Sequence, residues 1–219
     1  MQRRVTTTVR RDHASSERAR LSRDRERRWN HNIHFHRLVT DAIPAGATSA
    51  IDVGTGDGAL AGELRAVMSD VTGIDLDQGV LARAQAEHPG VAWVHGDVMT
   101  HDFGRTFDVV ASIATLHHFD DMRAALRRLG ALTSPGGVLV VVGLARSTSL
   151  GDHAHDALGI AQHQWCSRTR TYWEHSAPTV WPPPHSYSEV RESAAQELPE
   201  VRWKRFALWR YALTWQRPE

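Results

Sequence analysis

The stretch IDVGTGDG (residues 51–58) decides the fold that this sequence predicts. An apolar run ends at Val53, glycines then occupy alternate positions, and leucines at helical spacing begin at once. Glycine adopts positive φ and lets a ligand approach the backbone, because it has no Cβ. In open α/β sheets, ligands bind at the carboxyl ends of the strands, so this turn is a candidate binding loop.

Short apolar runs and amphipathic stretches alternate around this loop. Strands are predicted, in chain order, at residues 49–53, 71–76, 91–97, 107–114 and 137–145. Their nearly continuous Val, Ile and Leu content is typical of strands covered on both faces, as in a parallel sheet. The helices predicted between them include one carrying Leu60, Leu64 and Val67, one at 78–88 capped by Asp77, and one from about Asp120. Such repetition predicts right-handed βαβ units.

The chain ends with two β-rich runs, 201–209 and 211–217, which only Arg210 separates. They predict a tight antiparallel hairpin, which follows a helix at 187–198. The expected fold class is therefore α/β. It is a Rossmann-like, doubly wound sheet of five parallel strands plus a C-terminal antiparallel hairpin, seven strands in all, with helices on both faces.

One domain is expected over residues 29–219. It starts with a short helix at 29–43, and its segment 147–186, which shows little clean periodicity, is expected to form a lid that also lines a ligand pocket. Residues 1–28 hold ten arginines and four acidic residues, a net charge of +6. Such a run predicts a disordered basic tail, with an RNA-binding arm as the alternative.

The composition restricts the partners. No apolar run approaches the roughly 20 residues that span a bilayer, so no membrane partner is expected. The chain beyond residue 28 carries a net charge of −5, which is unlike the basic face that nucleic acid requires. The single cysteine, Cys166, allows no internal disulfide, which suits a reducing cytoplasm. We therefore expect a cytoplasmic monomer or homodimer with a small-molecule partner.

Asp75 ends the second predicted strand, 21 residues after Gly54. A carboxylate there can accept hydrogen bonds from both hydroxyls of a ribose. Dinucleotide folds use Gly-x-Gly-x-x-Gly to receive a pyrophosphate, whereas the third glycine here, Gly58, comes one residue early. Asp52 and Asp57 repel a pyrophosphate but suit a ligand with an ammonium and a sulfonium, which argues against NAD. A strand–helix turn that binds nothing is the plainer alternative.

These motifs resemble those of the class I S-adenosylmethionine-dependent methyltransferases, in particular the small type 11 enzymes. The resemblance covers residues 29–217. It rests on IDVGTGDG (51–58), GIDLD (73–77), GDV (96–98), FDVVASIATLHHF (107–119) and LTSPGGVLVVV (132–142). It implies S-adenosyl-L-methionine as the cofactor. The residues that it implies for cofactor binding are Asp52, Gly54, Thr55, Gly56, Gly58, Asp75, Leu76, Asp97, Val98 and Ser112.

The resemblance also implies how these residues act. In the family the glycine loop wraps the methionine part of the cofactor, the acid matching Asp75 holds the ribose, and the residue matching Leu76 packs on the adenine. The GDV motif lies at the adenine edge. Because Ala111-Ser112 replaces a pair that is often larger, a backbone carbonyl near Ser112 is expected to meet the cofactor's amino group.

Histidines are the candidate catalytic residues. His117 and His118 follow the fourth predicted strand, where the loop of small-molecule relatives lines the acceptor pocket. Imidazole is a natural general base near neutral pH, although packing within a turn is the alternative reading. His31 and His34 are spaced by about one helical turn, but no carboxylate cluster follows the fourth strand, so no metal is expected.

Tryptophans gather in the last third of the chain. Trp165, Tyr172, Trp173 and Trp181 could line an apolar acceptor pocket or pack against the sheet. Trp203, Trp209 and Trp215 lie on the hairpin and are expected to be core or surface-packing residues.

The expected function is transfer of a methyl group to an oxygen, nitrogen or carbon atom of a small molecule. The Asn/Asp-Pro-Pro-aromatic tetrapeptide of base and glutamine methylation is replaced by residues 112–115, SIAT. The Pro-Cys pair of cytosine C5 enzymes is also absent, since Cys166 follows a tryptophan. Three alternatives stay open: a protein that binds the cofactor without methylating, a methyltransferase acting on protein or RNA, and a nicotinamide oxidoreductase.

Overall fold

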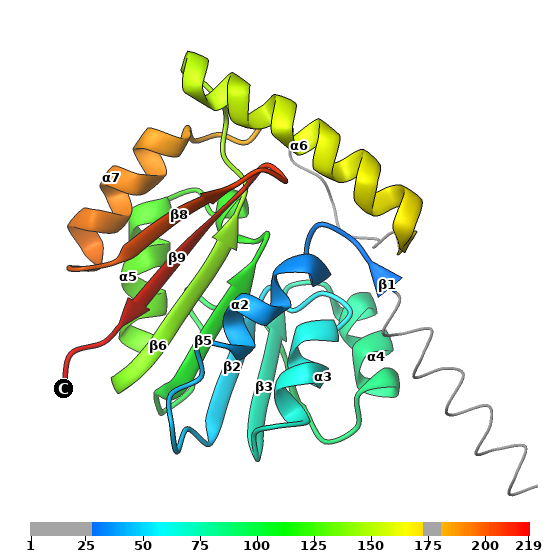
Figure 1. Ribbon diagram of the computed structural model, residues 1–219. Helices are drawn as coiled ribbons and strands as arrows, with labels where there is room; N and C mark the ends of the chain where they lie inside the picture. The colour runs from blue at the N-terminus through cyan, green and yellow to red at the C-terminus, as the bar shows by residue number, and fades with distance from the viewer. Residues whose placement is uncertain (1–27, 173–180) are drawn as a thin grey trace, which may run out of the picture.

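The computed structural model describes residues 28–172 and 181–219 of the chain. Its centre is a seven-stranded sheet of order β4-β3-β2-β5-β6-β9-β8 (Figure 1). The strands are β2 (Ser49–Val53), β3 (Asp70–Asp75), β4 (Ala92–His95), β5 (Phe107–Ile113), β6 (Thr133–Gly143), β8 (Arg202–Phe206) and β9 (Arg210–Gln216). The first five are parallel, and β9 is antiparallel to β6 and β8. The predicted doubly wound sheet with a C-terminal hairpin is confirmed.

Helices cover both faces of this sheet. Alternate residues of a strand point to opposite faces, so Ile51 belongs to one core and Ala50 to the other. The helices α5 (Met122–Leu132) and α7 (Tyr187–Glu197) contribute to the first core, and α2 (His36–Thr40) and α3 (Ala59–Arg65) to the second. The helix α4 (Gln78–Glu87) lies against β3 and β4 and is capped by Asp77, as predicted.

The antiparallel strand β9 brings its first residue to the edge at which the parallel strands end. Tyr211 pairs with Gly143, the last residue of β6, so Arg210 stands beside this carboxyl edge. The prediction that Arg210 alone forms the hairpin turn is wrong. Residues 207–209 form it, because Trp209 adopts the left-handed backbone conformation (φ 54°) and its nitrogen donates to the carbonyl of Ala207.

The expected lid segment is largely one helix, α6 (Leu150–Thr169). It begins with a capping box between Ser149 and Asp152. Only Gly159 and Cys166 of this helix are buried, so its sequence lacks the apolar stripe by which a helix is recognised. In Figure 1, α6 lies across the top of the molecule, over the β8–β9 turn.

Close contacts fasten α6 to the sheet. A Cβ on Gly159 would lie 2.1 Å from the carbonyl oxygen of Ala207, so glycine permits the helix to touch the β8–β9 turn. Arg205 pairs with Asp152 and, at 3.3 Å, with Asp156. Beyond the helix, β7 (Thr171–Tyr172) pairs in parallel with β1 (Arg28–Trp29). The lid segment is therefore held both to the sheet and, through β7, to β1.

Three local expectations differ from the structure. Residues 29–43 form not one helix but the end of β1, a 3₁₀ turn, η1 (Ile33–Phe35), and the short α2. The side-chain oxygen of Asn30 accepts hydrogen bonds from the nitrogens of Asn32 and Ile33 and so turns the chain after β1. Val67 lies beyond the end of α3 and is 67% exposed. Arg28 belongs to β1, and residues 1–27 of the expected tail lie outside the described residues.

Candidate active site

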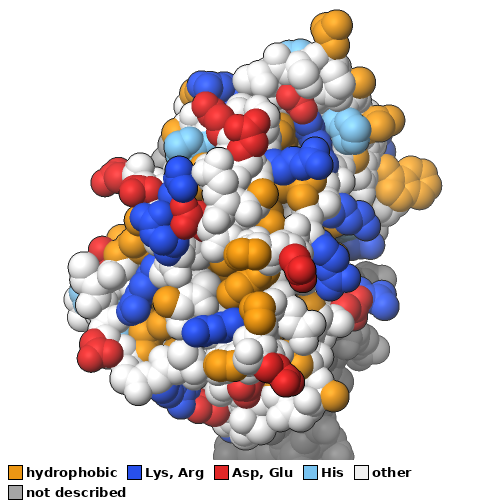
Figure 2. All heavy atoms as spheres, turned by 90° about the vertical axis from the view of Figure 1, so that its left-hand side faces the viewer, with side chains coloured by type: hydrophobic (Ala, Val, Ile, Leu, Met, Phe, Trp, Pro, Cys, Tyr) orange, Lys and Arg blue, Asp and Glu red, His pale blue; other side chains and the backbone are white. Residues whose placement is uncertain are grey.

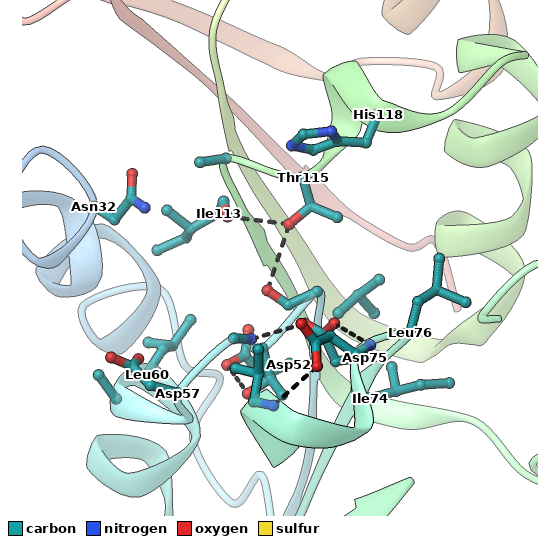
Figure 3. A pocket seen from close by; sticks show the side chains of 18 of the residues that line it. Asn32, Asp52, Asp57, Leu60, Ile74, Asp75, Leu76, Ile113, Thr115 and His118 are labelled. Carbon is teal, nitrogen blue, oxygen red and sulfur yellow. Dashed lines mark hydrogen bonds between the residues drawn. The ribbon is translucent and has the colours of Figure 1, made fainter. Parts of the chain in front are cut away.

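A cavity of about 1010 Å³ runs along the carboxyl edge of the sheet. Residues that follow β2, β3, β4 and β5 line it in turn, and Leu144 after β6 and Arg210 of β9 complete the far end. Figure 3 shows side chains from these separate loops converging on one space. The cavity lies where the glycine loop predicts a binding site, at the edge that open α/β sheets use for ligands.

The glycine loop forms one wall of the cavity. The backbone nitrogens of Gly54 and Thr55 both donate to the carbonyl of Ile74, at 2.9 and 3.1 Å, which holds the loop against β3. Gly54 has φ +69°, and a Cβ there would lie 2.2 Å from the hydroxyl of Thr115. Gly56 has φ +56° with nothing within 4 Å of its Cβ position, so its backbone is open to a ligand.

Asp75 stands beside this loop at the end of β3. One carboxylate oxygen accepts from the nitrogen of Gly56 at 2.9 Å, and the other accepts from the nitrogen of Asp77 at 3.0 Å. Each oxygen keeps a further lone pair for a ligand. The next residue, Leu76, also lines the cavity and is 69% exposed, so its apolar side chain is open to a ligand. Asp75 and Leu76 therefore offer a ligand a polar and an apolar contact side by side.

Asp52 is the buried acid of the loop. The residue is 2% exposed, and its carboxylate accepts a hydrogen bond of 2.7 Å from the hydroxyl of Thr55. Burial raises the pKa of Asp52 to about 6, and the bond from Thr55 only partly opposes this. A carboxylate held in such surroundings gains from a cationic ligand, because the ligand's charge compensates for the lost water.

The GDV motif lines the next part of the cavity after β4. Asp97 accepts a hydrogen bond from the nitrogen of Met99 at 2.9 Å, which fixes its side chain in the loop. Val98 is buried and forms part of the first core while touching the cavity. The two residues lie on the same side of the cavity as Asp75 and Leu76, since β4 is the neighbour of β3.

His117 and His118 belong to the 3₁₀ turn η2 (Leu116–His118) after β5, and both line the cavity. Their rings lie 4.1 Å apart. Burial, and then the neighbouring charges of His118 and Arg210, lower the pKa of His117 to about 4, so its imidazole is neutral at pH 7. Its Nδ1 is buried and makes no hydrogen bond to any described residue. The pKa of His118, whose ring lies above Thr115 in Figure 3, is also lowered by burial.

Two residues that the sequence assigned to cofactor binding do not line this cavity. Gly58 has φ +77°, and a Cβ there would lie 2.4 Å from the ring of Trp93, so this glycine serves the packing of the loop on the sheet. Ser112 is fully buried and donates to the carbonyl of Val53 at 3.2 Å. Because β5 ends one residue later, Ile113 and Ala114 reach the cavity in its place.

The far end of the cavity contains residues that sequence reasoning missed. Asn30, Asn32 and Trp209 line it together with Arg210. They come from opposite ends of the chain, so no local spacing of residues predicts that they meet in one cavity. Trp209, expected to be a packing residue, is brought there by the β8–β9 turn. His31 also lines the cavity, and its ring stacks on that of His163 from α6, with the centroids 5.0 Å apart.

The aromatic residues of the lid contribute little of the described wall. Trp165 is 70% exposed and lies outside the cavity, so the structure contradicts a pocket role for it. Trp181 lines the cavity, although it is 69% exposed. Trp173 and the side chain of Tyr172 lie outside the described residues. Trp215 is a core residue, and Trp203 packs against the same core, as expected.

The half of the cavity beside the glycine loop, called the near half below, fits a cationic nucleoside ligand. Gly56 leaves the space that a Cβ would fill, Asp75 faces that space, and Asp52 is a desolvated acid beneath it. Within residues 28–172 and 181–219, no group of three or more His, Cys, Asp and Glu side chains is placed to hold a metal ion. In that same part of the chain, no helix has both the length and the apolar character that a membrane crossing needs.

The chain is similar in sequence to known proteins. Residues 51–141 match the family described as "Methyltransferase domain". An uncharacterized methyltransferase of Mycobacterium tuberculosis is 39% identical over 193 residues, which cover 87% of this chain and 98% of that protein. A ubiquinone biosynthesis O-methyltransferase of Azorhizobium caulinodans is 29% identical over 119 residues, which cover 52% of this chain and 47% of that protein.

Solved structures share the fold. The N-methyltransferase NodS of Bradyrhizobium japonicum, in complex with S-adenosyl-L-homocysteine, superposes with a TM-score of 0.57 at 21% identity and covers 85% of this chain and 87% of its own. DesVI of Streptomyces venezuelae superposes with a TM-score of 0.60 at 17% identity, covering 94% of this chain and 98% of its own.

Proposed function

Since the chain belongs to the class I S-adenosylmethionine-dependent methyltransferases, we propose that it methylates a small molecule bound at the far end of the cavity. S-adenosylmethionine is its cofactor. One observation carries the proposal: the cavity does not end at the glycine loop but continues past His117 to Leu144 and Arg210. Its volume of about 1010 Å³ is near the upper limit of typical small-molecule sites, about 1,000 Å³.

The near half would hold the cofactor. Asp75 would bind the ribose hydroxyls, Leu76 would pack on the adenine, and Asp97 would contact the adenine edge. The open backbone at Gly56 and the buried carboxylate of Asp52 suit the cationic methionine part. When bound there, S-adenosylmethionine supplies an activated methyl group on a sulfonium and leaves as S-adenosylhomocysteine.

The far half would position the acceptor and exclude water, which is the protein's main contribution to a displacement of this kind. Trp209 and Leu144 provide apolar surface, and α6 lies across the edge above them. The neutral imidazole of His117 can take the acceptor's proton if the methylated atom carries one. Its buried Nδ1 makes no bond to a described residue, which leaves this nitrogen available for such contact.

On one face of the molecule the surface charges, like the cavity, favour a small acceptor over RNA. On the face that Figure 2 shows, the side of the molecule that carries α7 and β8, basic and acidic side chains are interspersed. Binding to nucleic acid favours a continuous basic patch instead. The Mycobacterium relative carries no stated acceptor, and the ubiquinone enzyme matches only half of its own length.

The test is transfer of an isotope-labelled methyl group from S-adenosylmethionine to a panel of small phenols, acids, amines and thiols. We expect a product that carries one labelled methyl group in place of a hydrogen, formed only when the protein is present, and much less of that product with Asp75→Ala. Cofactor binding by calorimetry without any methylated product across the panel would favour a binding protein. Methylation of RNA or protein in place of every small acceptor would overturn the proposal.

A further inference from the structure

Ring side chains gather at the far end of the cavity. Beyond the loops that follow β2, β3 and β4, the described lining residues include His117, His118, Phe119, Trp181 and Trp209. Flat rings contact one another in offset-stacked or edge-to-face arrangements, and these contacts add to the gain from apolar burial. A cavity wall that is rich in rings therefore favours a ligand that itself contains a flat ring.

Trp209 reaches this wall through an unusual backbone conformation. Its φ is 54°, in the left-handed region, which is rare for a side chain as large as indole. In the described part of the chain, the other residues with positive φ that are not glycine are Ala114 and Glu200, and Ala114 lines the same cavity. Backbone strain that the surrounding structure maintains is concentrated at functional sites. The conformation of Trp209 therefore indicates a role for its ring in ligand binding.

The neighbours of Trp209 hold its indole in place. A Cβ on Gly159 would lie 3.0 Å from Cε2 of the indole, so the ring packs against α6. The rings of His31 and His163 are tilted against it, with centroid distances of 5.8 and 6.1 Å. The residue is nevertheless only partly buried, and it lines the cavity. One part of the indole is therefore fixed against the protein while another part contacts the cavity, and a surface fixed in advance costs a ligand less entropy.

The indole of Trp209 lies at the same end of the cavity as His117. The pKa of His117 is lowered by burial and also by the nearby charges of His118 and Arg210, so the residue next to Trp209 is close to this imidazole. The turn that carries His117 follows Thr115, whose hydroxyl donates to a carbonyl of the glycine loop at 3.5 Å. A ring bound against Trp209 would therefore have its substituents near His117 and near the half assigned to the cofactor.

We propose that Trp209 binds a flat ring of the methyl acceptor, so that the substrate is a small aromatic compound. This rests on the proposed function. Contact between two rings adds about 2- to 13-fold to an affinity beyond the effect of apolar burial, the equivalent of about 0.5–1.5 kcal/mol. Trp209 is a specificity-determining residue in this assignment, because a saturated molecule of the same size lacks that contact.

The experiment compares aromatic compounds with their saturated counterparts, which are similar in size and carry the same polar group. The full chain is saturated with S-adenosylhomocysteine and titrated calorimetrically with phenol and cyclohexanol, benzoic and cyclohexanecarboxylic acid, benzamide and cyclohexanecarboxamide, and naphthol and decahydronaphthol. We expect at least one aromatic compound to bind about three-fold or more tighter than its counterpart. Equal binding, or no binding, within every pair would overturn the aromatic site.

Variants locate the preference. Trp209→Leu keeps an apolar side chain but removes the ring, so it should abolish the preference while S-adenosylhomocysteine still binds, and Trp209→Phe should retain part of the preference. The matched control is Trp165→Leu, which should behave as the wild type, because Trp165 is an exposed tryptophan of α6 outside the cavity. If Trp209→Leu does not fold, Trp209→Gly is the second variant, since glycine adopts a φ of 54° without strain, and it should also abolish the preference.

The outcomes separate this inference from the proposed function. Persistence of the aromatic preference in Trp209→Leu, or in Trp209→Gly where that variant is needed, would overturn the assignment. Methyl transfer to a saturated small molecule, with no preference for aromatic compounds in the titrations, would also overturn it and would leave the methyltransferase function intact.

Discussion

The carboxylate of Asp75 accepts a hydrogen bond of 2.9 Å from the backbone nitrogen of Gly56, 19 residues earlier in the chain. This bond joins the end of β3 to the glycine loop that follows β2. The two elements that would hold opposite parts of the cofactor are therefore fixed to each other before any ligand binds. Such pre-organisation reduces the entropy that binding would otherwise cost.

The first prediction concerns Asp75. Asp75→Ala removes charge-assisted bonds to the ribose and the brace on Gly56, so we expect S-adenosylmethionine binding to weaken by about 1–3 kcal/mol, roughly 5- to 150-fold. Isothermal titration calorimetry measures the affinity. The control is Asp102→Ala, because Asp102 makes a comparable bond to the nitrogen of Gly104 away from the cavity. Unchanged affinity in Asp75→Ala would contradict the assignment of Asp75 to the ribose of the cofactor.

The second prediction concerns Asp52, whose folded pKa of about 6 lies above the value of about 3.9 for an unfolded chain. A raised pKa means that the folded state binds the proton more tightly, so this group's contribution to stability is full below pH 4 and is lost as the pH rises through 6. Asp52→Asn should therefore raise the free energy of unfolding at pH 8 by about 1–3 kcal/mol.

The same substitution should weaken cofactor binding, because it removes the negative charge beside the loop. Urea denaturation of the ligand-free protein between pH 4 and pH 8 measures the first effect, and calorimetry measures the second. We expect a smaller loss of stability with rising pH in the variant than in the wild type. An equal pH dependence in both proteins would show that Asp52 titrates normally.

The third prediction concerns His117. His117→Ala should lower kcat by about 100-fold or more if the imidazole takes a proton from the acceptor, whereas the Kd for S-adenosylmethionine should change little. Because the pKa of His117 is about 4, its base form is populated throughout pH 6–8. The wild-type rate should therefore not fall with protonation of this residue until the pH approaches 4.

His155→Gln, on the exposed side of α6, is the matched control and should leave kcat unchanged. A pH–rate profile with purified acceptor and a separate cofactor titration provide the measurements. Equal losses of kcat and of cofactor affinity in His117→Ala would make His117 a cofactor-binding residue instead.

The fourth prediction separates backbone strain from packing at two glycines of similar conformation. Gly58 (φ +77°) would place a Cβ 2.4 Å from Trp93, whereas Gly46 (φ +81°) has nothing within 4 Å. Alanine at either position should lower the free energy of unfolding by about 1–2 kcal/mol, because it must adopt the left-handed conformation. Gly58→Ala should lower it by about 1–3 kcal/mol more, because the ring of Trp93 must shift to make room for the Cβ. Chemical denaturation measures both, and equal losses would mean that Trp93 moves freely.

The fifth prediction concerns the docking of α6. A Cβ on Gly159 would lie 2.1 Å from the backbone carbonyl of Ala207, which cannot move aside as a side chain can. Gly159→Ala should therefore loosen the helix and raise hydrogen exchange along residues 150–169, although alanine favours an isolated helix. Gly151→Ala, whose Cβ would lie 3.8 Å from the Ser149 hydroxyl, is the control. Slower exchange in Gly159→Ala would contradict the contact.

Local pattern was sufficient for most of the fold. The strand at 49–53 and the capping of α4 by Asp77 follow from burial on both faces and from side-chain hydrogen bonding, which neighbouring residues determine. The glycine loop and Asp75 could be predicted because each lies at the end of its own apolar strand. α6 could not, because Gly159 and Cys166 are its only buried residues and leave no stripe to detect.

The sequence by itself determined the class of protein and the half of the cavity that would receive the cofactor, since those residues follow three consecutive parallel strands. Only the tertiary structure decided which residues line the far end of the cavity, opposite the residues that would hold the cofactor. Arg210 and Asn32 are 178 residues apart, and they meet because β9 runs antiparallel to β6 and returns its first residue to the carboxyl edge. The pairing of β9 with β6 arises from long-range packing, which no local spacing of residues encodes.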